Sequence, residues 1–151
     1  MATQIAAIEA LRIEANATRN AIRALHNSYH GDDIRGMRHD EQTYTELLRL
    51  HGQLTEQRNQ IYDLTIAFGR DDTIDRDMRI AYIKSQMKAN AKLSDKYIAG
   101  INNMVRNSQT QRYNDNGNYK HWVDSSMTTL RTRLNENRTR RATYMAIYRH
   151  I

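Results

Sequence analysis

The chain contains no proline in 151 residues and only six glycines. Proline breaks the interior of a helix, and disordered segments are usually rich in it, so its absence favours long uninterrupted helices. The strongly apolar residues are 14 Ile, 10 Leu, 2 Val and 1 Phe, which is about 18% of the chain and low for a globular domain. This composition predicts slim helices that each bury one narrow stripe, rather than a broad globular core.

Apolar residues repeat every seven positions in the first half of the chain. In residues 2–29 the repeat consists of Ile8, Ala15, Ile22 and Tyr29, and in residues 40–68 it consists of Leu47, Leu54, Ile61 and Phe68. Additional residues of the same stripes are Leu11, Thr18, Leu25, Leu50 and Leu64. This is the a/d pattern of coiled-coil helices. We therefore predict two helices here, separated by the glycine- and aspartate-containing segment 30–36.

The second half of the chain predicts two further helices, at about 72–107 and 119–150. A helical projection of the first gives a stripe of Ile80, Ile83, Met87, Ala91, Ser94, Ile98, Ile101 and Val105. The second gives Val123, Met127, Leu130, Leu134, Asn137, Arg141, Tyr144 and Tyr148. Gly69 is expected to end the preceding helix, and Asp71 or Asp72 to cap the next. The polar and aperiodic stretch 107–118 predicts the longest loop.

These patterns predict an all-α fold in which residues 1–151 form one domain. The arrangement is either an elongated four-helix up-and-down bundle or two long helical hairpins with coiled-coil-like seams. Polar residues interrupt the expected seams: Thr18, Gln57, Arg58, Asn90 and Asn137. Helices with so little apolar surface commonly need partner chains to complete their burial, so we expect protein partners in a homo-oligomer or a larger assembly.

The net charge of +6 is concentrated at the C-terminal end, where residues 111–151 contribute +5 while residues 40–70 contribute −2. Four lysines recur every four residues in the third predicted helix: Lys84, Lys88, Lys92 and Lys96. Such a row could follow the phosphate backbone of a nucleic acid. Without an opposing row of acidic residues, the pattern favours an ordinary solvated helix face.

Arginines flank the apolar stripe of the fourth predicted helix. Arg131 and Arg138 lie on one side of it, Arg133 and Arg140 on the other, and Arg141 within it. This placement resembles the e and g positions of a coiled coil and favours pairing with carboxylates. The expected acceptors are the acidic residues of 40–68, namely Glu41, Glu46, Glu56 and Asp63, or a neighbouring subunit. Contact of this helix with nucleic acid or an anionic membrane surface is the alternative.

No complete catalytic, metal-binding or cofactor-binding motif occurs, so we expect no enzyme activity, no catalytic residue, no metal and no cofactor. The chain has no cysteine, which excludes disulfides and thiolate ligands. His26 and His30, followed by Asp32, are the one spacing that could hold zinc. No transmembrane or secretory segment is evident, so we expect an intracellular location, cytoplasmic or nuclear, or a place within a virus particle.

The sequence therefore predicts a non-enzymatic structural subunit that acts through helix–helix contacts in a larger complex, such as a virion or a filament. The alternative is a basic nucleic-acid-binding or packaging protein. That protein would use the row from Lys84 to Lys96 together with the C-terminal arginines.

Overall fold

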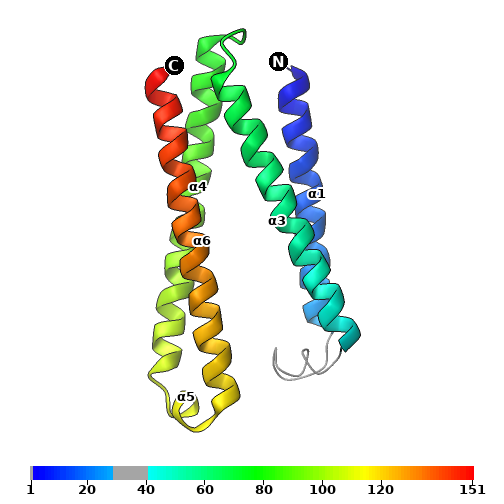
Figure 1. Cartoon of the computed structure of the whole chain (residues 1–151), viewed down its shortest axis with the longest axis vertical. Coiled ribbons are helices and arrows are strands. Elements are labelled where there is room, and N and C mark those ends of the chain that lie inside the picture. Colours follow the sequence, from blue (N-terminus) through cyan, green and yellow to red (C-terminus); the bar gives the residue numbers. More distant parts are fainter. Residues whose placement is uncertain (1, 29–40) are drawn as a thin grey trace. The chain divides into compact units, whose positions relative to one another are not determined.

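A computed structural model describes residues 2–28 and 41–151 of the chain. These residues form five helices and no strand, which confirms the all-α fold (Figure 1). The four long helices are α1 (Ala2–Ser28), α3 (Glu41–Arg70), α4 (Arg76–Ser108) and α6 (Gly117–His150). They correspond closely to the four helices that the sequence predicts.

The link between α3 and α4 differs from the prediction in its details. Gly69 does not end α3 but lies buried in its last turn, and the helix continues to Arg70. The cap of α4 is Asp75, whose carboxylate accepts a hydrogen bond from the backbone N–H of Met78 at 3.1 Å. Asp71 instead accepts from the backbone N–H of Thr73 at 3.0 Å and so stabilises the turn that precedes this cap.

The stretch predicted as the longest loop contains a short helix, α5 (Gln111–Asp115). The Thr110 hydroxyl accepts from the N–H of Tyr113 and caps α5. The Asn116 side chain accepts from the N–H groups of Asn118 and Tyr119 and caps α6, so that α6 already begins at Gly117. Polar residues that indicate a loop in the sequence serve here as helix caps.

The described structure divides into two compact units, residues 1–74 (unit 1) and 75–151 (unit 2). In unit 1, α1 packs against α3, and in unit 2, α6 packs against α4 and α5. Figure 1 shows each pair of long helices side by side. The expectation that the whole chain forms one domain stays a prediction, as does the way in which the two pairs would combine into a bundle.

Unit 1 buries one stripe from each of its two helices. Gln4 at the start of α1 donates to Asp71 just after α3 at 3.2 Å, so the two helices are antiparallel. The prediction that Leu64 belongs to the buried stripe is wrong. Leu64 is 37% exposed, while its neighbour Thr65 is fully buried. The Thr65 hydroxyl donates to the carbonyl of Ile61 at 2.7 Å, which satisfies it inside the stripe. The buried residues of α1 and α3 are Ile8, Ala15, Thr18, Leu50, Leu54, Gln57, Thr65, Phe68 and Gly69.

Unit 2 is also an antiparallel pair, because Arg76 at the start of α4 donates to the carbonyl of Ile151 after α6 at 2.8 Å. Gly100 marks a close approach of the two helices, since a Cβ there would lie 3.1 Å from Leu130 Cδ1. Ile98, predicted in the stripe, is 39% exposed. The buried apolar residues of the pair are Ile83, Met104, Val123, Leu134, Tyr144 and Ile147.

A buried polar cluster lies near the middle of this seam. The Asn90 amide donates to the Asn137 side-chain oxygen at 2.8 Å, and the Asn137 amide donates to the Asn90 carbonyl at 2.9 Å and to Ser94 Oγ at 2.8 Å. Asn90 and Asn137 are 8% and 7% exposed, which confirms their prediction as buried polar positions. Because each amide reaches across to the other helix, the cluster holds the two helices in one register.

Candidate functional site

The row of four lysines lies on α4 and is exposed along its whole length. None of the four forms an ion pair with any residue in 2–28 or 41–151. At a rise of about 1.5 Å per residue, the row extends over about 18 Å of the helix. It therefore presents four cations to solvent, and no carboxylate of the described residues neutralises them.

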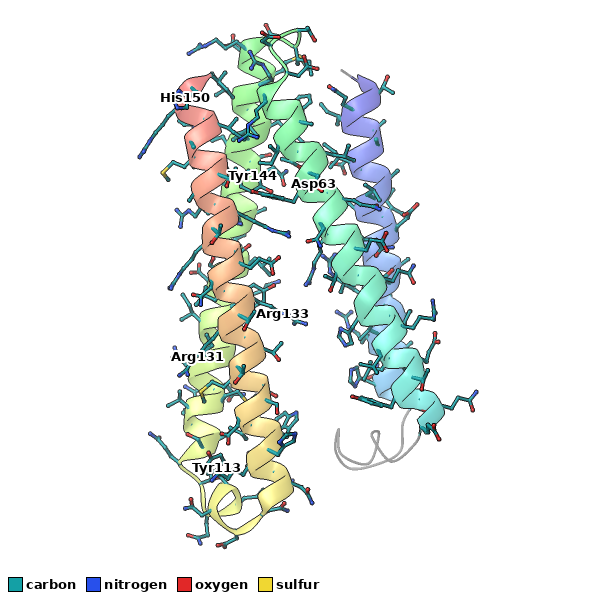
Figure 2. All side chains as sticks on the ribbon, viewed as in Figure 1. Asp63, Tyr113, Arg131, Arg133, Tyr144 and His150 are labelled. Atoms are coloured by element: carbon teal, nitrogen blue, oxygen red, sulfur yellow. The ribbon has the colours of Figure 1, made fainter. Side chains whose placement is uncertain are left out.

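The C-terminal arginines divide into two groups on α6. Arg131, Arg138 and Arg141 are exposed, whereas Arg133 and Arg140 are half-buried. Figure 2 shows Arg131 and Arg133 on opposite sides of the helix. Arg141 was predicted within the apolar stripe, and its exposure corrects this, because Asn137 and Tyr144 fill the stripe at that level instead.

Local ion pairs form within α6 and within α3. Arg140 binds Glu136 of the same helix at 2.8 Å. On α3, Arg49 donates two hydrogen bonds to Glu46, and this interaction lowers the pKa of the Glu46 carboxyl below its usual value. Pairing of the α6 arginines with Glu41, Glu46, Glu56 and Asp63 would join the two units, and it stays a prediction.

The unit boundary separates two very different charges. Unit 2 contains 15 Lys and Arg against 6 Asp and Glu, which gives it a net charge of +9. Unit 1 contains 8 Lys and Arg against 11 Asp and Glu, which gives it a net charge of −3. Since the predicted site residues Lys84–Lys96 and Arg131–Arg141 all belong to unit 2, the fold gathers the basic residues into one antiparallel helix pair.

A second group of side chains, which the sequence patterns did not single out, lies where α5 meets the start of α6. We call it the tip cluster, and it consists of Arg112, Tyr113, Tyr119, Lys120 and Trp122. The Arg112 guanidinium lies 4.2 Å from the centre of the Tyr119 ring, which lies 5.7 Å from the centre of the Trp122 ring. The Lys120 ammonium lies 5.6 Å from the centre of the Tyr113 ring. Cations and aromatic rings therefore alternate at this end of unit 2, where Figure 2 labels Tyr113.

Local helix caps build this cluster. The Thr110 and Asn116 caps form α5 and turn the chain directly into α6, which brings residues 112–113 beside 119–122. The signal in the sequence is the mixture of Tyr, Trp, Lys and Arg between positions 112 and 122. It gives no apolar periodicity, because its residues belong to two short segments that meet only after folding.

Tyr113 carries the clearest electrostatic perturbation of the tip cluster. Its hydroxyl donates to Asp124 Oδ1 at 2.8 Å, and this hydrogen bond, followed by partial burial and the carboxylate charge, raises the pKa of Tyr113 above its usual value. A raised pKa means that the interaction is fully present below the unfolded pKa of about 10 and is lost as the pH rises through the folded pKa.

Replacing Asp124 with asparagine is therefore expected to lower the pKa of Tyr113 back toward its usual value, because an amide oxygen is a weaker acceptor for the Tyr113 hydroxyl than a carboxylate and carries no charge that opposes phenolate formation. The measurement is a phenolate absorbance titration of the Asp124→Asn and parent chains. The Tyr113→Phe variant serves to identify the signal among the nine tyrosines. An unchanged Tyr113 titration would contradict the assignment.

Within the part of the chain that the structure describes, no group of three His, Asp or Glu residues is placed to hold a metal ion. The candidate zinc spacing cannot be followed there, since His30 and Asp32 lie outside the described residues. No helix among the described residues is long and apolar enough to cross a membrane.

Fold and site together define an all-α protein of antiparallel helix pairs, one weakly acidic and one strongly basic. Searches of protein-family models, of curated proteins and of solved structures found no match to the chain.

Proposed function

We propose that the chain is a non-enzymatic assembly subunit that binds copies of itself or other proteins through helix–helix contacts, within a larger complex such as a virion or a filament. The observation that supports this proposal is the small amount of apolar surface buried between the paired helices. Among the described residues, 12 apolar and 7 polar side chains are buried, so more than a third of the buried positions contribute little hydrophobic stabilisation.

Each unit also covers only one stripe of each of its helices. Among the described residues, each long helix packs against one other long helix of its own unit, whereas stable helical domains usually bury helices against several neighbours. Large apolar side chains remain outside the seam of unit 1, where Ile13 and Leu48 are 71% and 55% exposed. A further helix, from another copy or another protein, would complete this burial.

Light scattering and circular dichroism over a concentration series test this proposal. We expect the mass to rise with concentration, and the thermal midpoint with it, because association stabilises the folded state by mass action. The variant Ile13→Glu/Leu48→Glu should shift the mass toward the monomer. A matched control is Asn20→Glu/Gln60→Glu, which places two carboxylates at other exposed positions of the same helices. A fully helical monomer at every concentration, with no protein partner, would contradict the proposal.

We propose nucleic-acid binding by unit 2 as a second function, because of its net charge of +9 and because the row Lys84–Lys96 has no ion-pair partner among the described residues. Each added copy of the chain brings a charge of +6 to an assembly. Contacts between identical copies do not cancel this charge, and the repulsion grows as copies are added. A polyanion such as DNA or RNA would neutralise it, and the two functions are therefore compatible in one packaging complex.

Binding to DNA or RNA of mixed sequence, measured between about 50 and 200 mM salt, tests the second function. Each phosphate neutralised by a cation contributes about 0.7 to 0.9 to the slope of log affinity against log salt. We expect a slope of several units and little sequence preference. Absence of binding at the lowest salt would contradict this function. The intracellular or virion location stays a prediction from the sequence.

A further inference from the structure

The tip cluster combines the two features that bind single-stranded nucleic acid. Flat aromatic rings stack on bases, and neighbouring cations bind the phosphates that connect those bases. Tyr113, Tyr119 and Trp122 are each only half-buried, and Arg112 and Lys120 are exposed. The rings thus retain accessible surface beside two cations.

The carboxylates near these cations are already engaged. Asp115 accepts hydrogen bonds from Gln111 at 2.9 Å, and Asp124 accepts from Tyr113 at 2.8 Å. Neither forms an ion pair with Arg112 or Lys120. The guanidinium of Arg112 lies over the Tyr119 ring instead, which is the arrangement in which arginine also stacks on a base.

The cluster is also continuous with the basic surface of unit 2. It lies at the start of α6, the helix that further along carries Arg131, Arg138 and Arg141. The antiparallel register places the end of α4 beside the start of α6, with Lys96 at the level of Arg131. A strand whose bases stack at the tip could therefore continue along these cations.

We infer that the tip cluster is a stacking site for the bases of single-stranded DNA or RNA, with Tyr119 and Trp122 as the stacking rings. This inference rests on the second proposed function. A paired duplex offers no free base faces, so the site distinguishes single strands from duplexes. The cations of unit 2 would bind the phosphates of single strands and of duplexes alike.

Trp122 is the single tryptophan of the chain, and its fluorescence reports this site directly. The parent chain is titrated with an oligothymidylate of about 12 nucleotides, near the upper end of the usual site sizes for single strands. Separate titrations use a duplex, heparin and vesicles containing phosphatidylserine. Heparin is a polyanion without bases, so it separates charge from stacking. We expect the oligonucleotide to quench Trp122 strongly, and the duplex and heparin to bind with little quenching.

The variant Tyr119→Ala should weaken oligonucleotide binding about 10-fold while leaving heparin binding unchanged, since one stacked base is worth roughly one to two orders of magnitude in affinity. Tyr148→Ala is the matched control, because Tyr148 is a partly exposed tyrosine at the opposite end of the same helix. Circular dichroism checks that both variants keep their helicity. If Tyr119→Ala does not fold, the quenching of Trp122 in the parent chain decides the question alone.

The outcomes separate this inference from the function on which it rests. Oligonucleotide binding without quenching, and with equal affinity for the two tyrosine variants, would overturn the stacking site and leave the second function intact. Absence of binding to both oligonucleotide and duplex would overturn that function as well. If the fluorescence of Trp122 changes with the vesicles and with none of the other ligands, Trp122 inserts into a membrane surface instead of stacking on bases. This result would overturn the inference.

Discussion

Replacing Asn137 with leucine is expected to lower the free energy of unfolding by about 2 to 3 kcal/mol, because it leaves buried polar groups without partners. The Asn137 amide is the donor to both the Asn90 carbonyl and Ser94 Oγ, and its oxygen accepts from the Asn90 amide. The Asn137 amide also donates to the Asn90 side-chain oxygen at 3.3 Å, so the substitution removes a donor from both this oxygen and Ser94 Oγ. Urea unfolding followed by circular dichroism measures the change.

Two controls make this result specific. Asn135→Leu changes the same residue type at an exposed position of α6 and should alter stability by no more than about 0.5 kcal/mol. The triple variant Asn90→Leu/Ser94→Ala/Asn137→Leu removes the whole cluster and should recover the loss to within about 1 kcal/mol, since no side chain of the cluster is left with an unpaired polar atom. We expect it to lose the single register, with doubled or broadened amide resonances. An Asn137→Leu chain as stable as Asn135→Leu would contradict the role of the cluster.

Reversing the charge of Lys84, Lys88, Lys92 and Lys96 to glutamate is expected to weaken nucleic-acid binding by about 100-fold or more near physiological salt. The four exposed lysines have no carboxylate partner among the described residues, so their removal costs no internal ion pair. The salt slope should fall by about 3 units, close to the value for four lost phosphate contacts. The measurement repeats the salt series on this variant.

A control with the same change in net charge distinguishes a local surface from a general electrostatic effect. Unit 1 offers exposed positions that give the same change in net charge without breaking the Arg49–Glu46 ion pair: Arg19, Arg23, Arg70, Asn20 and Gln60, all changed to glutamate. This variant should retain a salt slope close to that of the parent. Equal losses in the two variants would show that the row on α4 is not the binding surface.

The helices were predictable because their signals are local and repeated. The lack of proline, together with a seven-residue spacing such as Ile8 to Ala15, fixes both the element type and the buried face. The buried positions Asn90 and Asn137 were predictable in the same way, from their place in the stripe. Their partnership was not, because it depends on the register between two helices, and the two asparagines lie 47 residues apart in the chain.

Other details depend on competition between similar residues. Asp71, Asp72 and Asp75 are equally suitable caps by composition, and the turn stabilised by Asp71 decides in favour of Asp75. Leu64 and Thr65 differ by one position, and a seven-residue repeat drifts by about 20° per heptad on a straight helix, so the sequence alone assigns the wrong one. The tip cluster escaped prediction because Arg112 and Tyr119 meet only once α5 has formed.

Each helix pair is contiguous in the chain, with unit 1 ending at residue 74 before unit 2 begins. Contacts between segments near in sequence form quickly, since little loop-closure entropy opposes them. During synthesis on the ribosome, the acidic pair can thus fold while the basic pair is still being translated. Unit 1 has a net charge of −3 and unit 2 a net charge of +9, so the basic surface for which we propose nucleic-acid binding is the later of the two to leave the ribosome.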